Sequence, residues 1–203
     1  LLHKNKPMIV VWDDHEFTNN TWKDGAENHS KDEGIFLNRK INALKAYYEW
    51  MPIRENTNKT NIWRSFEVGN LFQLLMLDTR LISRDKQLDI NAFFADGVFD
   101  YESYEKDLNK PRKLLGNKQF SWVKNTLDKK YKWSIFGQQI LIGPQYLPEA
   151  LKKIDKSLIP EYMHKYLQLA GKNLPWHTDP WDGYPKEREK LYKIIQNSQS
   201  NII

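Results

Sequence analysis

Four consecutive residues, Asp13, Asp14, His15 and Glu16, bring three carboxylates and one imidazole together in the chain. They follow directly on a short apolar run, Met8–Trp12, which is typical of a buried strand that presents polar groups at its carboxyl end. Carboxylate oxygens bind hard cations, and imidazole binds borderline ones. Carboxylates gathered without a cation would raise one another's pKa by repulsion, and a bound metal relieves that cost. The segment is therefore a candidate metal site.

The backbone conformation of this segment decides how many of its side chains meet. On a straight strand, Asp14 and Glu16 would face one side while Asp13 and His15 faced the other. A turn would gather more of them. The alternative to a metal site is a solvated acidic turn in which His15 caps a neighbouring element. The apolar run before the segment and the long polar loop expected at 18–34 favour the metal site, because loops of that length are usually functional or disordered.

Hydrophobic periodicity predicts the elements that position the segment. A helix is indicated over 37–51, and Pro52 ends it. Its apolar residues recur at steps of three and four: Leu37, Ile41, Leu44, Tyr48 and Met51. A hairpin follows, with strands at 64–68 and 71–77 joined by a Gly69-Asn70 turn.

The second half of the chain continues this alternation. We predict, in order, an irregular excursion at 82–112, a helix at 117–130 with Phe120, Val123 and Leu127 inward, a strand at 133–142, loops and short helices at 144–182, and a helix from Pro185 that buries Leu191, Ile194 and Ile195. Strands separated by helices and long excursions predict an α/β or mixed α+β fold. No boundary divides the chain convincingly, so a single domain over 1–203 is expected.

Composition narrows the classes of function. The 40% of hydrophobic and 28% of charged residues are typical of a globular protein. The high aromatic content, 13%, indicates either stacking on sugars or bases or many aromatic anchors in core and loops, and we favour the anchors. The net charge of +5 suits an anionic substrate, but the lysines are scattered, so no specific nucleic-acid binding is indicated.

The absence of cysteine excludes disulfides and a thiolate metal site within these 203 residues. No apolar run reaches membrane-spanning length, and the first residues lack the pattern of a signal peptide. A core-strand pattern begins almost at Leu1, and Asn201–Ile203 indicates the start of another strand. Both ends are therefore expected to lie inside a fold.

An ordered set of motifs resembles one enzyme family. The segment Trp12–Glu16, followed by Asn19-Asn20 and Trp22, resembles the signature of PhoD-type alkaline phosphatases. The resemblance continues in order through Asp24–His29, Ala46–Arg54, Leu77–Arg80, Leu115-Gly116 with Gln119 and Trp122, Phe136–Gln139, and Trp181–Pro185 with Arg188. These matches cover nearly the whole chain.

The resemblance implies a calcineurin-like metallophosphoesterase that hydrolyses phosphate monoesters or diesters. It implies a portion of a double β-sheet sandwich flanked by helices, with a dinuclear centre of calcium and iron at the carboxyl ends of strands. Asp14 occupies a metal-ligand position and His15 the catalytic one, while Asn19 or Asn20 adds a ligand. A small-molecule phosphate ester is the expected partner, a monomer the expected state, and a secreted or periplasmic location the one that the family suggests.

Four further residues remain candidates around the site. Asp13 or Glu16 is expected to support His15. Arg80, with Asp78, either clamps phosphate or forms a structural ion pair, and the ion pair is favoured. His29 either lines the site or orders its loop with a hydrogen bond.

The resemblance also implies that metal-binding segments precede Leu1 and follow Ile203. The chain on its own is therefore expected to hold an incomplete dinuclear centre and to be inactive. Two alternatives stay open: a nuclease or phospholipase-like diesterase on the same scaffold, and a non-enzymatic module that binds anionic glycans.

Overall fold

The computed structural model describes residues 2–54 and 60–203, and these fall into two compact units. Unit 1 comprises Leu1–Lys86, Lys113–Gln139 and Leu191–Ile203, and unit 2 comprises Gln87–Arg112 and Ile140–Lys190. Each unit is thus assembled from segments that are distant in the sequence. The expectation of a single domain over 1–203 stays a prediction.

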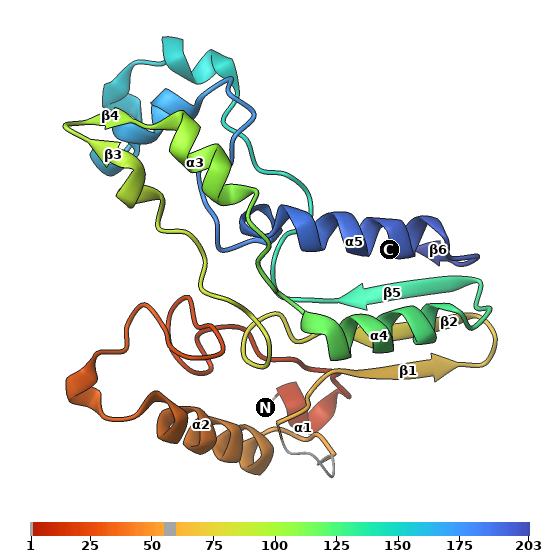
Figure 1. The fold of residues 1–203 in the computed structure, drawn as a ribbon. Helices are drawn as coiled ribbons and strands as arrows, with labels where there is room; N and C mark the ends of the chain where they lie inside the picture. The colour runs from red at the N-terminus through yellow and green to blue at the C-terminus, as the bar shows by residue number, and fades with distance from the viewer. Residues whose placement is uncertain (1, 55–59) are drawn as a thin grey trace. The chain divides into compact units, whose positions relative to one another are not determined.

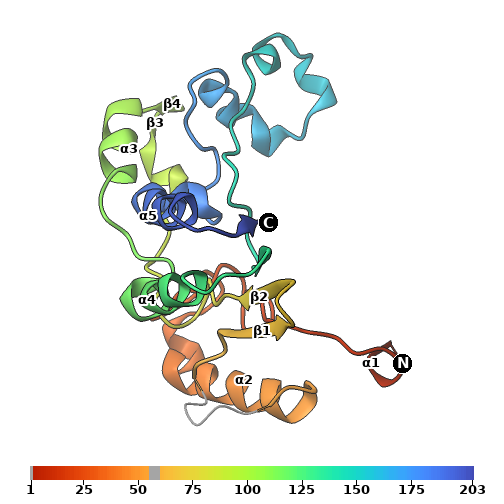
Figure 2. The ribbon, with the colours of Figure 1, turned by 90° about the vertical axis from the view of Figure 1, so that its right-hand side faces the viewer.

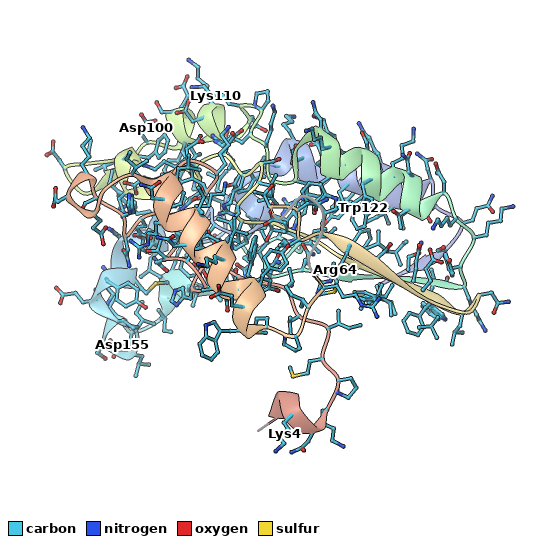
Figure 3. The ribbon with its side chains drawn as sticks, turned by 90° about the horizontal axis from the view of Figure 1, so that it is seen from below. Lys4, Arg64, Asp100, Lys110, Trp122 and Asp155 are labelled. Carbon is cyan, nitrogen blue, oxygen red and sulfur yellow. The ribbon has the colours of Figure 1, made fainter. Side chains whose placement is uncertain are left out.

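Unit 1 contains the predicted hairpin. Strand β1 (Arg64–Val68) pairs antiparallel with β2 (Phe72–Met76), and Arg64 lies opposite Met76. Figure 3 shows Arg64 at the start of β1. The turn between the strands needs a residue in the left-handed region, and Gly69 provides it with a φ of 52°.

The hairpin belongs to a four-stranded sheet with the order β1-β2-β5-β6. Strand β5 (Trp133–Gly137) is parallel to β2, and β6 (Asn201–Ile202) is parallel to β5. Parallel strands need a crossover connection, and helix α4 (Gly116–Leu127) supplies the one between β2 and β5. Figures 1 and 2 both show α4 alongside the sheet. The predictions of a helix before β5 and of a strand at the end of the chain are confirmed.

Helix α4 packs on the sheet through one face. Val123 and Leu127 are buried as predicted, whereas Phe120 is only half-buried. The buried Gln73 of β2 donates from Nε2 to the carbonyl oxygen of Thr126 (3.2 Å) and to Oγ of Ser134 (2.8 Å). These bonds tie the helix, β2 and β5 together.

Helix α2 (Phe36–Trp50) confirms the element predicted at 37–51 but not its buried face. Leu37 and Ile41 are more than half exposed, and the helix buries Phe36, Leu44 and Tyr47 instead. The prediction of the apolar stripe was therefore partly wrong. Periodicity identified the helix, but its buried face is the one that packs against Trp12 and Phe17 in the core.

The segment Met8–Trp12 is not a strand, which corrects the prediction for this run. Met8 and Ile9 are exposed, Val10 and Val11 are half-buried against the core, and only Trp12 is fully buried. The carbonyl oxygen of Val10 accepts a hydrogen bond from the guanidinium of Arg64 rather than from a strand backbone. A short helix, α1 (Leu2–Asn5), precedes the segment.

Unit 2 is built around aromatic side chains. Its elements are η2 (Ile90–Phe93), β3 (Phe94–Ala95) paired with β4 (Val98–Phe99), α3 (Tyr101–Leu108), η3 (Glu149–Lys153), η4 (Lys156–Leu158), η5 (Glu161–Leu169) and η6 (Trp181–Gly183). Phe93 and Phe99 each pack against the fully buried Tyr104, with ring centroids 5.1 and 5.2 Å apart. In unit 2, these aromatic side chains anchor the hydrophobic core, as was favoured from the composition.

The prediction of an irregular excursion at 82–112 missed α3. Asp100 caps this helix by accepting a hydrogen bond from the N–H of Ser103 (3.0 Å). The short helices and loops predicted at 144–182 are confirmed. So is the last helix, α5 (Pro185–Gln196), in which Leu191 is buried while Ile194 and Ile195 are half-buried.

The units thus combine helices and strands as the mixed α/β prediction requires. Within the described part of the chain, no helix has both the length and the apolar character needed to cross a membrane.

Candidate metal and catalytic site

The candidate site begins at Trp12, whose indole anchors the segment in the core of unit 1. Trp12 is fully buried, and its ring packs against Phe17 and Tyr47 at centroid distances of 5.2 and 5.0 Å. Its Nε1 donates to Oδ1 of Asp78 (3.2 Å), which follows β2. The residues after Trp12 therefore begin at a fixed point beside the residue that follows β2 by two positions.

A tight turn follows this anchor. The carbonyl oxygen of Asp14 accepts hydrogen bonds from the N–H groups of Phe17 and Thr18, both at 2.8 Å. The buried side chain of Asp14 accepts from the N–H of His15 (3.0 Å) and from the N–H of Asn20 (2.8 Å). Of the two conformations considered from the sequence, the turn is the one observed, and it gathers the polar groups.

The imidazole of His15 lies near two oxygen atoms of this turn. Nε2 of His15 lies 3.1 Å from Oδ1 of Asn19 and 3.9 Å from Oδ2 of Asp14. Ligands that lie about 2.0–2.6 Å from one cation are about 3–4 Å apart when they are neighbours in its shell. The side chain of His15 is 76% exposed, whereas that of Asp14 is 11% exposed. The donor set fits a hard or borderline cation.

Arg80 stabilises the turn through its contacts with two carboxylates. Its side chain is 3% exposed, and its Nε donates to Oδ1 of Asp13 at 2.6 Å. Its Nη2 lies 4.0 Å from Oδ1 of Asp14. Oε2 of Glu16 accepts from the N–H of Asp13 (2.5 Å). Arg80 thus places a buried positive charge beside two carboxylates of the segment.

Asp78 organises the chain after β2. Its carboxylate accepts from the indole of Trp12 and from the N–H groups of Arg80, Leu81 and Ile82, at 3.0–3.2 Å. Its own backbone is clamped by Gln119, which accepts from the Asp78 N–H and donates to the Asp78 carbonyl oxygen. The bond that the Asp78 carboxylate accepts from Arg80 comes from the backbone N–H, while the Arg80 guanidinium pairs with Asp13. The choice between a phosphate clamp and a structural ion pair stays a prediction.

His29 lies in a different environment from His15. Its side chain is 8% exposed, and its Nε2 contacts the carbonyl oxygen of Gly34 at 3.1 Å. Its Nδ1 lies 3.4 Å from Nη1 of Arg39 and 3.7 Å from Oε2 of Glu33. These contacts are of the kind that orders a loop, and the choice between the two roles of His29 stays a prediction.

A carboxylate that the sequence did not single out joins the two candidate asparagines. Oε2 of Glu27 accepts from Nδ2 of Asn19 (2.8 Å) and from Nδ2 of Asn20 (2.5 Å). Glu27 belongs to the motif at Asp24–His29, but a loop has no periodicity from which a contact seven or eight residues away can be predicted.

Comparisons with known proteins bear directly on this arrangement. The family model described as PhoD-like phosphatase matches residues 1–203. The chain belongs to the PhoD-like phosphatase family. Alkaline phosphatase D of Bacillus subtilis (strain 168) is 31% identical over 206 residues, covering 99% of this chain and 30% of that protein. A solved structure titled "Structure of PhoD" matches with a TM-score of 0.66 and 30% identity, covering 97% of this chain and 33% of that one.

The PhoD-like chain therefore spans about a third of the length of these relatives. The family resemblance and the mixed α/β fold class are confirmed. The roles assigned to individual residues stay predictions.

Two groups of helix α2 in this PhoD-like chain, the buried Tyr47 and the half-buried Lys40, have shifted pKa values. Burial raises the pKa of Tyr47 to about 12. Burial also lowers the pKa of Lys40, against the opposing charges of Asp78 and Asp24. Lys40 donates to the carbonyl oxygens of Leu81 (2.7 Å) and Lys23 (3.3 Å), and so connects α2 to the chain on both sides of the site.

Residues 2–54 and 60–203 contain no group of three or more His, Asp or Glu side chains arranged to hold a metal ion. The set described above has two such side chains, Asp14 and His15, and the amide oxygen of Asn19. Calcium takes about six to eight oxygen ligands. The turn of this PhoD-like chain can therefore supply part of the coordination of a cation.

Proposed function

We propose that this chain carries central active-site residues of a metal-dependent phosphoesterase that hydrolyses phosphate monoesters or diesters. The observation that supports the proposal most strongly is the turn, where the exposed imidazole of His15 lies 3.1 Å from Oδ1 of Asn19 and 3.9 Å from Oδ2 of Asp14. Membership of the PhoD-like phosphatase family supports the reaction class.

Each residue of the turn has a role in this proposal. Asp14 holds a cation through its carboxylate, and Asn19 or Asn20 adds an amide oxygen. The Asp14 carboxylate is already held in place by hydrogen bonds that it accepts from the backbone N–H groups of His15 and Asn20. A bound cation supplies electrostatic stabilisation of the charge on the phosphoryl oxygens. By family resemblance, the cations are calcium and iron in a dinuclear centre.

His15 is the proposed catalytic residue. Its imidazole is exposed to substrate, and it stabilises or protonates the oxygen that leaves the phosphorus. Oδ1 of Asn19, at 3.1 Å, limits the orientations that the ring adopts. Arg80 stabilises the turn, because its buried side chain forms an ion pair with Asp13 at the start of the turn.

The decisive experiment uses the full-length protein. Hydrolysis of an aryl phosphate monoester and of a bis-aryl phosphate diester is measured after removal of metals with a chelator and after addition of calcium and iron. Activity that is lost with the metals and restored with them is expected. Asp14→Ala should lower metal occupancy, while His164→Ala, whose ring contacts the carbonyl oxygens of Lys156 and Ile159, should leave both occupancy and activity unchanged.

The outcomes also separate the alternatives. Full activity in the chelated protein would contradict the proposal. Activity confined to nucleic acid or phospholipid diesters would assign the alternative diesterase function. Binding of an anionic glycan by the metal-free protein, without hydrolysis of any ester, would favour a binding module.

We further propose that residues 1–203, expressed alone, lack phosphoesterase activity and bind metal weakly. Asp14 and one asparagine supply the oxygen ligands of this turn, with Asp13 or Glu16 in support. That is at most about half of a calcium shell, and water would have to complete it. The segment is assayed beside the full-length protein on the same aryl phosphate. Turnover equal to that of the full-length protein would contradict this proposal.

A further inference from the structure

Glu27 makes side-chain contacts that converge on the candidate site. One of its oxygens, Oε2, accepts hydrogen bonds from the side-chain amides of both Asn19 and Asn20. Its N–H donates to the carbonyl oxygen of Asn19 (3.1 Å). The residue itself is exposed and contributes nothing to the hydrophobic cores of unit 1 among the described residues.

The loop that carries Glu27 closes back on the turn. Trp22 and Gly25 form an isolated bridge, and Oγ1 of Thr21 donates to the carbonyl oxygen of Gly25 (3.3 Å). A Cβ at Gly25 would lie 2.7 Å from Cζ2 of Trp22, so glycine is required for this close approach. Oγ1 of Thr18 donates to the carbonyl oxygen of Asn28 (3.4 Å). Glu27 is thus held at a defined position beside the asparagines.

The chemistry of the amide gives these contacts a consequence for cation binding. An asparagine side chain has a donor end, Nδ2, and an acceptor end, Oδ1, and only the oxygen binds a hard cation. An ionised carboxylate only accepts hydrogen bonds, so Glu27 selects the Nδ2 end of each amide. Oδ1 of Asn19 is accordingly the atom that lies 3.1 Å from Nε2 of His15.

We propose that Glu27 is a positioning residue that orients the amides of Asn19 and Asn20 so that their oxygens face the cation site beside Asp14 and His15. The inference rests on the proposed function, because it requires that a cation binds at this turn. It adds a residue that acts through the ligands without touching the cation. Glutamine at this position has an uncharged oxygen, and its other end is an N–H donor instead of a second oxygen. It would therefore hold the two Nδ2 groups less firmly in this orientation.

The test measures calcium affinity of the full-length protein by calorimetry, together with thermal unfolding of the metal-free form. Glu27→Gln is expected to weaken calcium binding by about 10- to 100-fold, the usual effect of losing a group that orients a metal ligand. The melting temperature of the metal-free protein should stay near the wild-type value. The kcat at saturating calcium should return toward wild type, because the ligands themselves remain.

Glu33→Gln is the matched control. Glu33 is a glutamate of the same polar loop that accepts hydrogen bonds from the N–H of Ser30 (2.9 Å) and from Arg39 (3.3 Å), and it contacts neither asparagine in any described bond. Its substitution should leave calcium affinity unchanged. Equal losses in Glu27→Gln and Glu33→Gln would mean that general loop order sets the affinity, and the inference would be overturned.

A double-mutant cycle with Asn19→Asp isolates the orientation effect. A carboxylate has two equivalent acceptor ends, so it needs no partner to choose between them. The loss caused by Glu27→Gln should therefore shrink severalfold in the Asn19→Asp background. An equal loss in both backgrounds, or none in the wild-type background, would overturn the inference. A wild-type protein that binds no calcium would instead overturn the proposed function.

Discussion

The turn at Asp13–Asn20 and the loop at His29–Arg39 each contain one histidine, and the two rings differ in their exposure and in their bonding partners. The ring of His15 is 76% exposed and faces the amide oxygen of Asn19. The ring of His29 is 8% exposed and contacts the carbonyl oxygen of Gly34 and the guanidinium of Arg39. It also packs edge-on against Phe36 of α2 at 5.2 Å.

This difference indicates that the histidine of the turn is accessible to a ligand, whereas the histidine of the loop has structural contacts. In the turn, the backbone and buried side chains are bonded while the ring of His15 is left accessible. In the loop, the histidine is itself the group that joins the backbone to α2. Both histidines belong to motifs that resemble the family signature, so burial and bonding partners, rather than motif membership, separate them.

The largest expected effect is on turnover. His15→Ala should lower kcat by about two to four orders of magnitude, because a lost general acid costs that much. His29→Ala should lower stability with a far smaller change in kcat. Both are measured on the full-length protein with its metal content determined. If His15→Ala loses as much metal as Asp14→Ala, then His15 is a ligand and the proposed division of roles is wrong.

The next effect concerns the anchor of the turn. Trp12→Ala should lower the free energy of unfolding by about 3–5 kcal/mol, because it leaves a cavity between Phe17 and Tyr47 and removes a donor to Asp78. Trp50→Ala is the matched control, since that indole is 83% exposed and its loss should change stability by less than about 0.5 kcal/mol. Denaturant unfolding measures both. Similar losses would show that the Trp12 contacts do not stabilise the turn.

A smaller effect is expected for the two arginines. Arg80→Met should destabilise the protein by about 1–3 kcal/mol, because Asp13 loses a partner that is itself buried. Arg39→Met should cost about 0–1 kcal/mol, because its ion pair with Glu33 is partly exposed and screened. Chemical denaturation at low and high salt measures the difference. A larger loss for Arg39 would reverse the contrast between turn and loop.

The smallest effect is a pH dependence in the loop. The hydrogen bond from the Ser30 N–H, assisted by the charge of Arg39, lowers the pKa of Glu33 below 4.5. A carboxylate with a depressed folded-state pKa stabilises the protein above its unfolded-state pKa, and that contribution is lost as the pH falls through the folded-state value. The stability difference between wild type and Glu33→Gln should therefore be constant near neutral pH and vanish in acid. A difference that grows on acidification would contradict this sign.

Several features could be predicted from the sequence because local physics determines them. The hairpin at Arg64–Met76 follows from two apolar runs and a glycine turn, and α4 and α5 follow from three- and four-residue spacing. The residues of the turn at Asp13–Asn20 were identified by type and by their resemblance to a family signature. The predictions that were wrong share one cause. The strand at Met8–Trp12, the buried face of α2 and the helix α3 were misjudged from apolar pattern alone.

What the sequence by itself determined is therefore the family, the class of fold and the set of residue types that can bind a cation and transfer a proton. The tertiary structure decided which of those residues meet. Arg80 forms an ion pair with Asp13, and the ring of His29 packs against Phe36 of α2. Glu27 accepts hydrogen bonds from the two asparagines. The physical reason is that periodicity reports contacts along one element, whereas a turn and a loop are shaped by hydrogen bonds between residues whose separation in the chain follows no period.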